Sequence, residues 1–76
     1  MNAATPRPDE VRLTVNGDEA VVPAGTTVAS LLGRLGVEPR GVAVAVDGEV
    51  VTRRRWGERS LTDGERVEIL SVAKGG

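Results

Sequence analysis

Apolar and polar residues alternate near both ends of this chain, and a helical spacing separates the two alternating regions. The run VRLTV, residues 11–15, places its three apolar side chains on one face of a strand. Asn16 and Gly17 follow, and this dipeptide tolerates the positive φ that a two-residue hairpin turn requires. The sequence therefore predicts an antiparallel hairpin whose second strand ends at Pro23.

The spacing becomes helical in TVASLLGRLG. Its apolar residues stand at i, i+3, i+4 and i+7, which is the pattern of one helical stripe: Val28, Leu31, Leu32 and Leu35. Thr27 is predicted to cap the first turn, with Thr26 as the alternative, and Gly36 to end the helix in the left-handed conformation. Gly33 inside a helix costs about 1 kcal/mol relative to alanine. We therefore expect the helix to pack closely against a sheet at this position.

Strand patterns return in the second half of the chain. Residues 41–46, GVAVAV, are nearly all apolar, as in a central strand. Asp47 and Gly48 repeat the hairpin signal, so EVV is predicted to be a short partner strand. A last alternating strand covers residues 66–72. The element order predicts an α+β fold of the ubiquitin-like β-grasp type, with a mixed sheet of four to five strands on one main helix and the last strand beside the first.

The polar stretch between these strands, residues 52–65, is predicted to be irregular. Trp56 and Leu61 are its expected anchors in the core. Residues 53–55 are three arginines that could steer an acidic partner, although a solvated loop is the simpler interpretation. Three carboxylates lack metal-ligand spacing and are expected at the surface: Asp63, Glu65 and Glu68.

Composition excludes several classes of function. The 76 residues include no histidine and no cysteine, which removes zinc sites, thiol nucleophiles and the usual general base. Ten basic and eleven acidic residues, with Trp56 as the only aromatic residue, give neither the field nor the stacking groups for nucleic-acid binding. No stretch has the length of a membrane span, and the N-terminus lacks a signal-peptide core. We therefore expect a cytoplasmic protein.

The chain divides into three predicted parts. Residues 1–10 are expected to form a disordered leader and residues 11–72 a single domain. Residues 73–76 are expected to be a flexible tail that ends in Gly-Gly.

Five short motifs, in order, carry a resemblance to a known family. LTVNG, TVASLL, GVAVAVDGEVVTRRRW, LTDGERVEIL and the final GG together resemble the ThiS family of thiamine-pathway sulfur carriers, over residues 11–76. Asp47 stands where the family commonly has asparagine, Thr52 where it often has proline, and the leader is additional. None of these departures lies in the tail.

The resemblance implies a chemistry at the carboxyl terminus. An adenylyltransferase similar to ThiF would activate the Gly76 carboxylate with ATP and magnesium, a sulfur-donor protein would convert it to a thiocarboxylate, and thiazole synthase would receive the sulfur. Gly75 and Lys74 would enter the partner's channel with it. The resemblance further implies a monomer that binds no cofactor, is no enzyme itself, and presents an apolar patch on its final strands to its partners.

Two other interpretations share this tail. The small subunit of molybdopterin synthase has a similar fold and Gly-Gly end but delivers sulfur to another pathway. A ubiquitin-like protein modifier or interaction module would conjugate the tail to lysines or leave it unused. Partner choice and the effect of deleting Gly76 distinguish the three.

Overall fold

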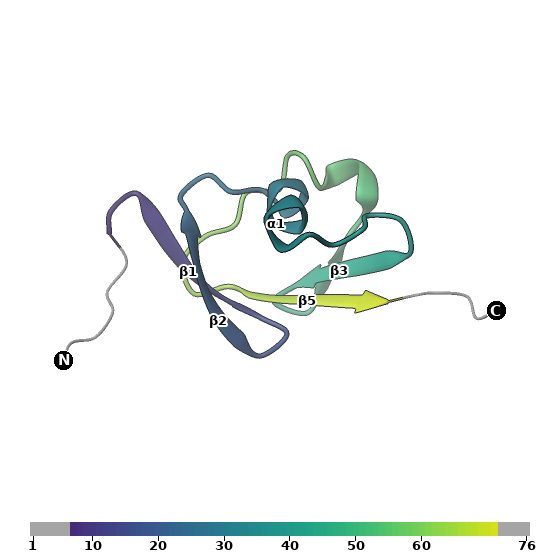
Figure 1. The fold of residues 1–76 in the computed structure, drawn as a ribbon, viewed down its shortest axis with the longest axis horizontal. Helices are drawn as coiled ribbons and strands as arrows, with labels where there is room; N and C mark the ends of the chain where they lie inside the picture. The colour runs from purple at the N-terminus through teal and green to yellow at the C-terminus, as the bar shows by residue number, and fades with distance from the viewer. Residues whose placement is uncertain (1–6, 72–76) are drawn as a thin grey trace.

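The computed structural model describes residues 7–71, which form one mixed sheet and one α-helix. The elements are β1 (Glu10–Val15), β2 (Asp18–Pro23), α1 (Val28–Leu35), β3 (Val42–Val46), β4 (Glu49–Val51), the 3-10 helix η1 (Arg53–Arg55) and β5 (Arg66–Ser71). The strand order is β2-β1-β5-β3-β4. In Figure 1 α1 lies over one face of this sheet. The predicted α+β β-grasp arrangement is confirmed, with five strands in the described part of the chain.

The central position of β5 follows from its two pairings. It runs parallel to β1, where Val15 pairs with Val67, and antiparallel to β3, where Val46 pairs with Val67. Two tight turns make the flanking hairpins, and their first residues, Asn16 and Asp47, have φ of 49° and 51°. These are left-handed values that asparagine and aspartate adopt more readily than other non-glycine residues.

Helix α1 begins and ends as its sequence predicts. The Thr27 hydroxyl accepts a hydrogen bond from the Ser30 amide, and the Ser30 side chain accepts one from the Thr27 amide, which makes a reciprocal capping box. Gly36 ends the helix with φ 69°, and its amide donates to the Gly33 carbonyl. The helix is short, so packing of its apolar face contributes most of its stability.

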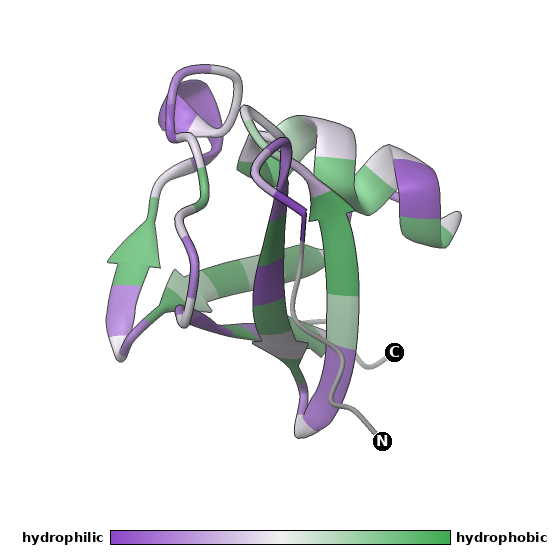
Figure 2. Ribbon diagram, turned by 90° about the vertical axis from the view of Figure 1, so that its left-hand side faces the viewer, coloured by the Kyte–Doolittle hydropathy of each residue, from purple (hydrophilic) through white to green (hydrophobic). Residues whose placement is uncertain are grey.

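The core lies between α1 and the sheet. Its buried members come from every strand except β4, from the helix and from the loop after η1: Leu13, Val22, Val28, Leu31, Leu32, Val44, Val46, Trp56, Leu61 and Val67. Both predicted loop anchors are therefore confirmed. Trp56 is 5% exposed and donates its indole N–H to the Val51 carbonyl at 2.8 Å, so the one polar atom of the ring is satisfied. Figure 2 shows hydrophobic residues concentrated along the strands and polar residues in the turns.

Four expectations need correction. Leu35 is 44% exposed and does not complete the buried stripe of the helix. Gly33 is exposed as well, with nothing within 4 Å of the position of an added Cβ, so close packing does not explain this glycine. Residues 53–55 form the η1 turn, where an irregular loop was expected. Residues 7–10 belong to the folded part, because the Asp9 carbonyl accepts a bond from Ala24, so the described fold begins before the predicted boundary at residue 11.

Candidate functional site

The three residues predicted to carry the chemistry, Lys74, Gly75 and Gly76, lie outside the described residues. What the structure describes is the strand from which they continue, β5, and the surface around it. The predicted alternation of β5 is confirmed as far as Ser71, with Val67 fully buried and Ile69 packed against the core. The described part of the candidate site therefore consists of β5 and its neighbours.

Turn side chains complete the hydrogen bonding of β5 on both of its flanks. On the β1 side, where that strand has ended, the Asn16 side-chain oxygen accepts from the Ile69 amide at 2.8 Å and its nitrogen donates to the Ile69 carbonyl at 3.2 Å. The Asn16 amide group thus replaces the next peptide unit of β1. On the β3 side, Asp47 Oδ1 accepts from the Arg66 amide at 2.8 Å. Both ends of β5 are therefore bonded beyond the regular ladders.

A third turn residue acts in the same way at the start of β1. Asp63 Oδ1 accepts from the Arg12 amide at 2.7 Å, and the Gly64 amide donates to the Arg12 carbonyl. The sequence identified the turns at Asn16 and Asp47 but not the bonds that their side chains make across the sheet. An Asx residue at a tight turn beside an unpaired strand end is the signal that could have revealed them.

The sheet face opposite α1, here called the open face, carries an apolar patch beside the end of β5. The patch consists of Ala43, Ala45, Val50 and Leu70, with Val50 73% and Leu70 58% exposed. Leu70 pairs directly with Ala43, and Ala45 with Val50, so the four side chains are cross-strand neighbours on one face. The expected apolar patch on the final strands is confirmed, and it lies beside the strand that leads to residue 76.

Charged side chains flank the apolar patch. Arg66 and Glu68 precede Leu70 along β5, with 4.0 Å between Arg66 Nε and Glu68 Oε2, and both side chains are exposed enough that their pairing adds little stability. Arg12 on β1 pairs with Glu19 on β2 at 2.8 Å. An apolar centre with a charged margin is the usual composition of a protein-binding surface.

The surface prediction is wrong for Glu65, which is bonded to Arg59. Arg59 Nη2 lies 2.8 Å from Glu65 Oε2, and the Glu65 side chain is only 14% exposed. Burial alone would raise the pKa of this carboxyl, but hydrogen bonds from Arg59 and from the Thr62 amide outweigh it and lower the pKa below its ordinary value. The hydrogen bond to Glu65 in turn raises the pKa of Arg59. This pair joins the loop after η1 to the start of β5.

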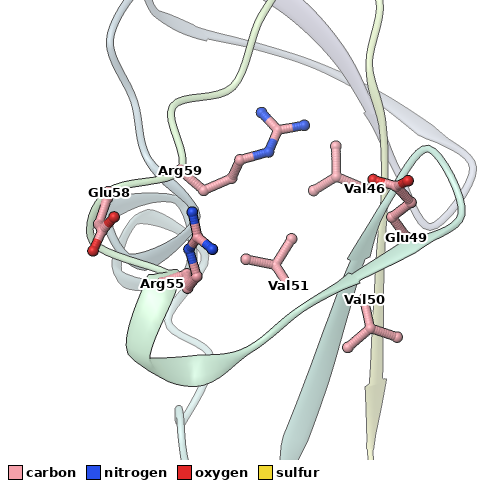
Figure 3. A pocket seen from close by; sticks show the side chains of 7 residues that line it. All are labelled: Val46, Glu49, Val50, Val51, Arg55, Glu58 and Arg59. Atoms are coloured by element: carbon pink, nitrogen blue, oxygen red, sulfur yellow. The ribbon is translucent and has the colours of Figure 1, made fainter.

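The three arginines of η1 are exposed, as expected for a solvated segment, but they are not equivalent. Arg53 donates to the Pro39 carbonyl and lies 5.7 Å from the centre of the Trp56 ring, so it has structural contacts. Arg55 borders a hollow of about 240 Å³ beside β4. Figure 3 shows that Arg55 lines this hollow together with Arg59, Glu49, Glu58 and valine side chains. Because the lining has two cations and two carboxylates, it does not favour a ligand of either charge.

Two further features bear on function. Among residues 7–71 no group of acidic side chains is arranged to bind a metal ion. No helix in that described range has the length and apolarity to span a membrane.

Comparison with known proteins identifies relatives along almost the whole chain. The ThiS family model matches residues 8–76. The sulfur carrier protein ThiS of Escherichia coli is 34% identical over 53 residues, which are 70% of this chain and 80% of that protein. The crystal structure of the thiamine biosynthesis protein ThiS from Geobacter metallireducens superimposes with a TM-score of 0.76 at 35% identity, over 87% of this chain and all of the other.

A thiazole synthase is also similar to this chain. The protein of that name from Paramagnetospirillum magneticum is 38% identical over 66 residues, which are 87% of this chain. The chain spans only 20% of the length of that relative. These matches favour the thiamine-pathway interpretation over the small subunit of molybdopterin synthase.

Proposed function

Because this chain belongs to the ThiS family, we propose that it is a sulfur carrier for thiamine thiazole synthesis and that Gly76 bears the sulfur. The observation that carries the proposal is that the family match extends through residue 76 and therefore includes the Gly-Gly end. The chain acts as a protein co-substrate of its partner enzymes, in the cytoplasm and as a monomer when free.

The proposed chemistry needs no base from this chain. A C-terminal carboxyl has a pKa of about 3.3 to 3.7, so it is ionised at neutral pH. In a ThiF-like adenylyltransferase its oxygen attacks the α-phosphorus of magnesium-bound ATP, the bond to pyrophosphate breaks, and an acyl-adenylate forms. Sulfur at the oxidation level of sulfide, delivered by a donor protein, then attacks the acyl carbon. AMP leaves, and Gly76 ends in a thiocarboxylate that thiazole synthase consumes.

The fixed position of β5 supports this proposal. Its backbone is bonded on the β1 side as far as Ile69, through Asn16, and is paired with β3 as far as Ser71, and residues 72–76 follow. Five residues can span at most about 17 Å, so a partner that takes residue 76 into its active site must also contact the surface around the end of β5. That surface is the apolar patch. Gly75 and Gly76 have no side chains, which suits them to a narrow channel that Lys74 would precede.

The direct test is the intact mass of the protein after incubation with a ThiF-like enzyme, magnesium, ATP and a sulfur source. The expected result is a gain equal to the replacement of one oxygen by sulfur, mapped to Gly76. A variant that lacks Gly76 is the control and should show no gain. An unchanged mass of the full chain beside an active partner would refute the proposal, and conjugates of higher mass would instead indicate a protein modifier.

The role of the apolar patch has its own test. Leu70→Arg places a charge at the centre of the patch without disturbing the core, because the Leu70 side chain is 58% exposed. We expect adenylation at limiting protein concentration to fall about tenfold or more, as for a central interface residue. Leu35→Arg is the matched control, since Leu35 is 44% exposed but lies on the helix, away from the open face. Equal losses in the two variants would contradict docking through the patch.

A further inference from the structure

Strand β2 forms one outer edge of the sheet, and alternate residues of it direct their backbone groups outward. Residues that flank a two-residue turn form a hydrogen-bonded pair, and such pairs then alternate along the hairpin. From the pair of Val15 with Asp18, the register makes Glu19 and Val21 the residues whose N–H and C=O groups face away from β1. Pro23, which has no N–H, also falls on an outward position, as this pattern requires.

The opposite edge of the sheet, strand β4, has fewer outward backbone groups with which another strand could pair. Strand β4 has three residues, and the same alternation leaves only Val50 with outward backbone groups. Within the described sheet, β2 is therefore the edge on which another strand finds more than one residue to pair with.

A groove runs beside this edge, between β2 and α1. Its volume is about 470 Å³, and six residues line it: Ala20, Val21, Val22, Leu31, Arg34 and Leu35. Val22 and Leu31 are buried and form an apolar floor, whereas Val21 and Leu35 are 43% and 44% exposed at its margins. The unexpected exposure of Leu35 thus belongs to the wall of a groove that lies along an open strand edge.

Charge in the groove points to the kind of occupant. The Arg34 side chain is exposed, and its guanidinium makes no hydrogen bond or ion pair with any other residue in the range 7–71. It lies in the last turn of α1, opposite the apolar part of β2. A carboxylate is the natural complement of a guanidinium at such a position. The turn end of β2 carries Asp18 and Glu19, which would repel a carboxylate there and so favour one placement of the ligand.

We propose that the outer edge of β2 and this groove bind an extended segment of a partner protein, in which apolar residues alternate with polar ones and one residue is acidic. The segment pairs with the outward groups of Glu19 and Val21, its apolar side chains enter the groove, and its carboxylate meets Arg34. The strand order separates this edge from β5 by β1, and the groove is on the helix side of the sheet. The partner can therefore bind while another protein occupies the open face and the tail, so the inference does not depend on the sulfur-carrier role.

The test uses the full chain labelled with 15N and a synthetic peptide. The probe is an acetylated and amidated octapeptide in which threonine and isoleucine alternate and one central isoleucine, a position that faces the groove, is replaced by aspartate. Its titration should shift the amide resonances of residues 19–22 and 31–35 and leave those around Leu70 unchanged. Absence of shifts at β2 at millimolar peptide would overturn the proposal.

Two variants identify the contacts. Val21→Pro removes the outward N–H and leaves the bonds to β1 intact, so binding should weaken about tenfold, as for one lost hydrogen bond. Arg34→Glu should reject the aspartate peptide and bind a matched peptide with lysine in its place. Unchanged affinity in both variants contradicts the proposal, and if Val21→Pro fails to fold, the charge exchange at residue 34 decides alone. If the protein forms a concentration-dependent dimer, and Arg34→Glu or Val21→Pro abolishes that dimer, the β2 edge binds a second copy of the chain. This result would also overturn the proposal of a partner protein.

Discussion

Replacement of Asn16 by glycine tests whether a turn side chain fixes the strand that leads to the tail. Asn16 has two roles in the structure: its backbone adopts φ 49° in the first hairpin turn, and its side chain makes two hydrogen bonds with the backbone of Ile69. Glycine adopts positive φ without strain, so Asn16→Gly keeps the turn and removes only the two bonds to β5.

The expected magnitude follows from those bonds. An intramolecular hydrogen bond contributes about 0.5 to 1.5 kcal/mol to stability, so the loss of two should lower the free energy of unfolding by about 2 kcal/mol. For a domain of this size that corresponds to a decrease in Tm of roughly 8 to 16 °C. Asn16→Ala should lose about 1 to 2 kcal/mol more, because alanine also strains the left-handed turn.

The assay combines thermal unfolding with amide hydrogen exchange. In Asn16→Gly the Ile69 amide should exchange faster than in the parent by more than the change in global stability explains, because its acceptor is gone. Asn16→Asp keeps the acceptor and removes the donor, so it should fall between the parent and the glycine variant. A glycine variant with the parent's Tm and unchanged Ile69 exchange would refute the claim that Asn16 secures β5.

Two other substitutions test single features of the fold. Gly33→Ala should raise the free energy of unfolding by about 0.5 to 1 kcal/mol, measured by denaturant titration, since the added methyl group meets nothing within 4 Å; a loss of stability would mean that the helix has a close neighbour there. Glu65→Gln should lose about 1 kcal/mol at pH 7. Because the pKa of Glu65 is lowered in the folded state, the stabilisation is complete above about pH 4.3, the ordinary glutamate value, and disappears as pH falls through the folded-state pKa. The difference in Tm between parent and variant should therefore shrink only below that pH, and a constant difference down to pH 2 would contradict the assignment.

The sequence predicted the elements because each has a local cause. The turn dipeptides, the Thr27 cap and the left-handed Gly36 act within a few residues, and the strand alternation directly reflects burial. The bonds from Asn16 to Ile69 could not be predicted in the same way, because 53 residues separate the partners and only the register of β1 against β5 brings them together. For the same reason, the alternation predicted for the last strand does not show that Leu70 has Ala43 as its neighbour on the open face.

The family resemblance predicted an apolar patch but not the groove beside β2, and the tail residues Lys74, Gly75 and Gly76 stay a prediction because they lie outside the described range. Leu35 stood at a regular stripe position, and periodicity gives the direction of a side chain without showing whether the sheet extends far enough to cover it. Here the sheet ends at β2, so the last turn of α1 projects past its edge.

The two internal departures from the family pattern have a physical explanation in the fold. Asp47 Oδ1 accepts a hydrogen bond from the Arg66 amide, and the side-chain oxygen of asparagine could accept the same bond. Aspartate in place of asparagine at residue 47 therefore keeps this bond to β5. Thr52 has φ −65° and ψ 149°, the conformation to which proline is restricted, and it follows the edge strand β4 at a position whose N–H faces away from β3. Thr52→Pro should therefore remove no ladder bond and should raise the free energy of unfolding by about 0.4 to 1 kcal/mol through the unfolded state alone. The rate of unfolding and the proposed adenylation of Gly76 should be unaffected by this change. If Thr52→Pro instead lowers the free energy of unfolding, the Thr52 amide donates a hydrogen bond that stabilises the fold, contrary to its outward position at the sheet edge.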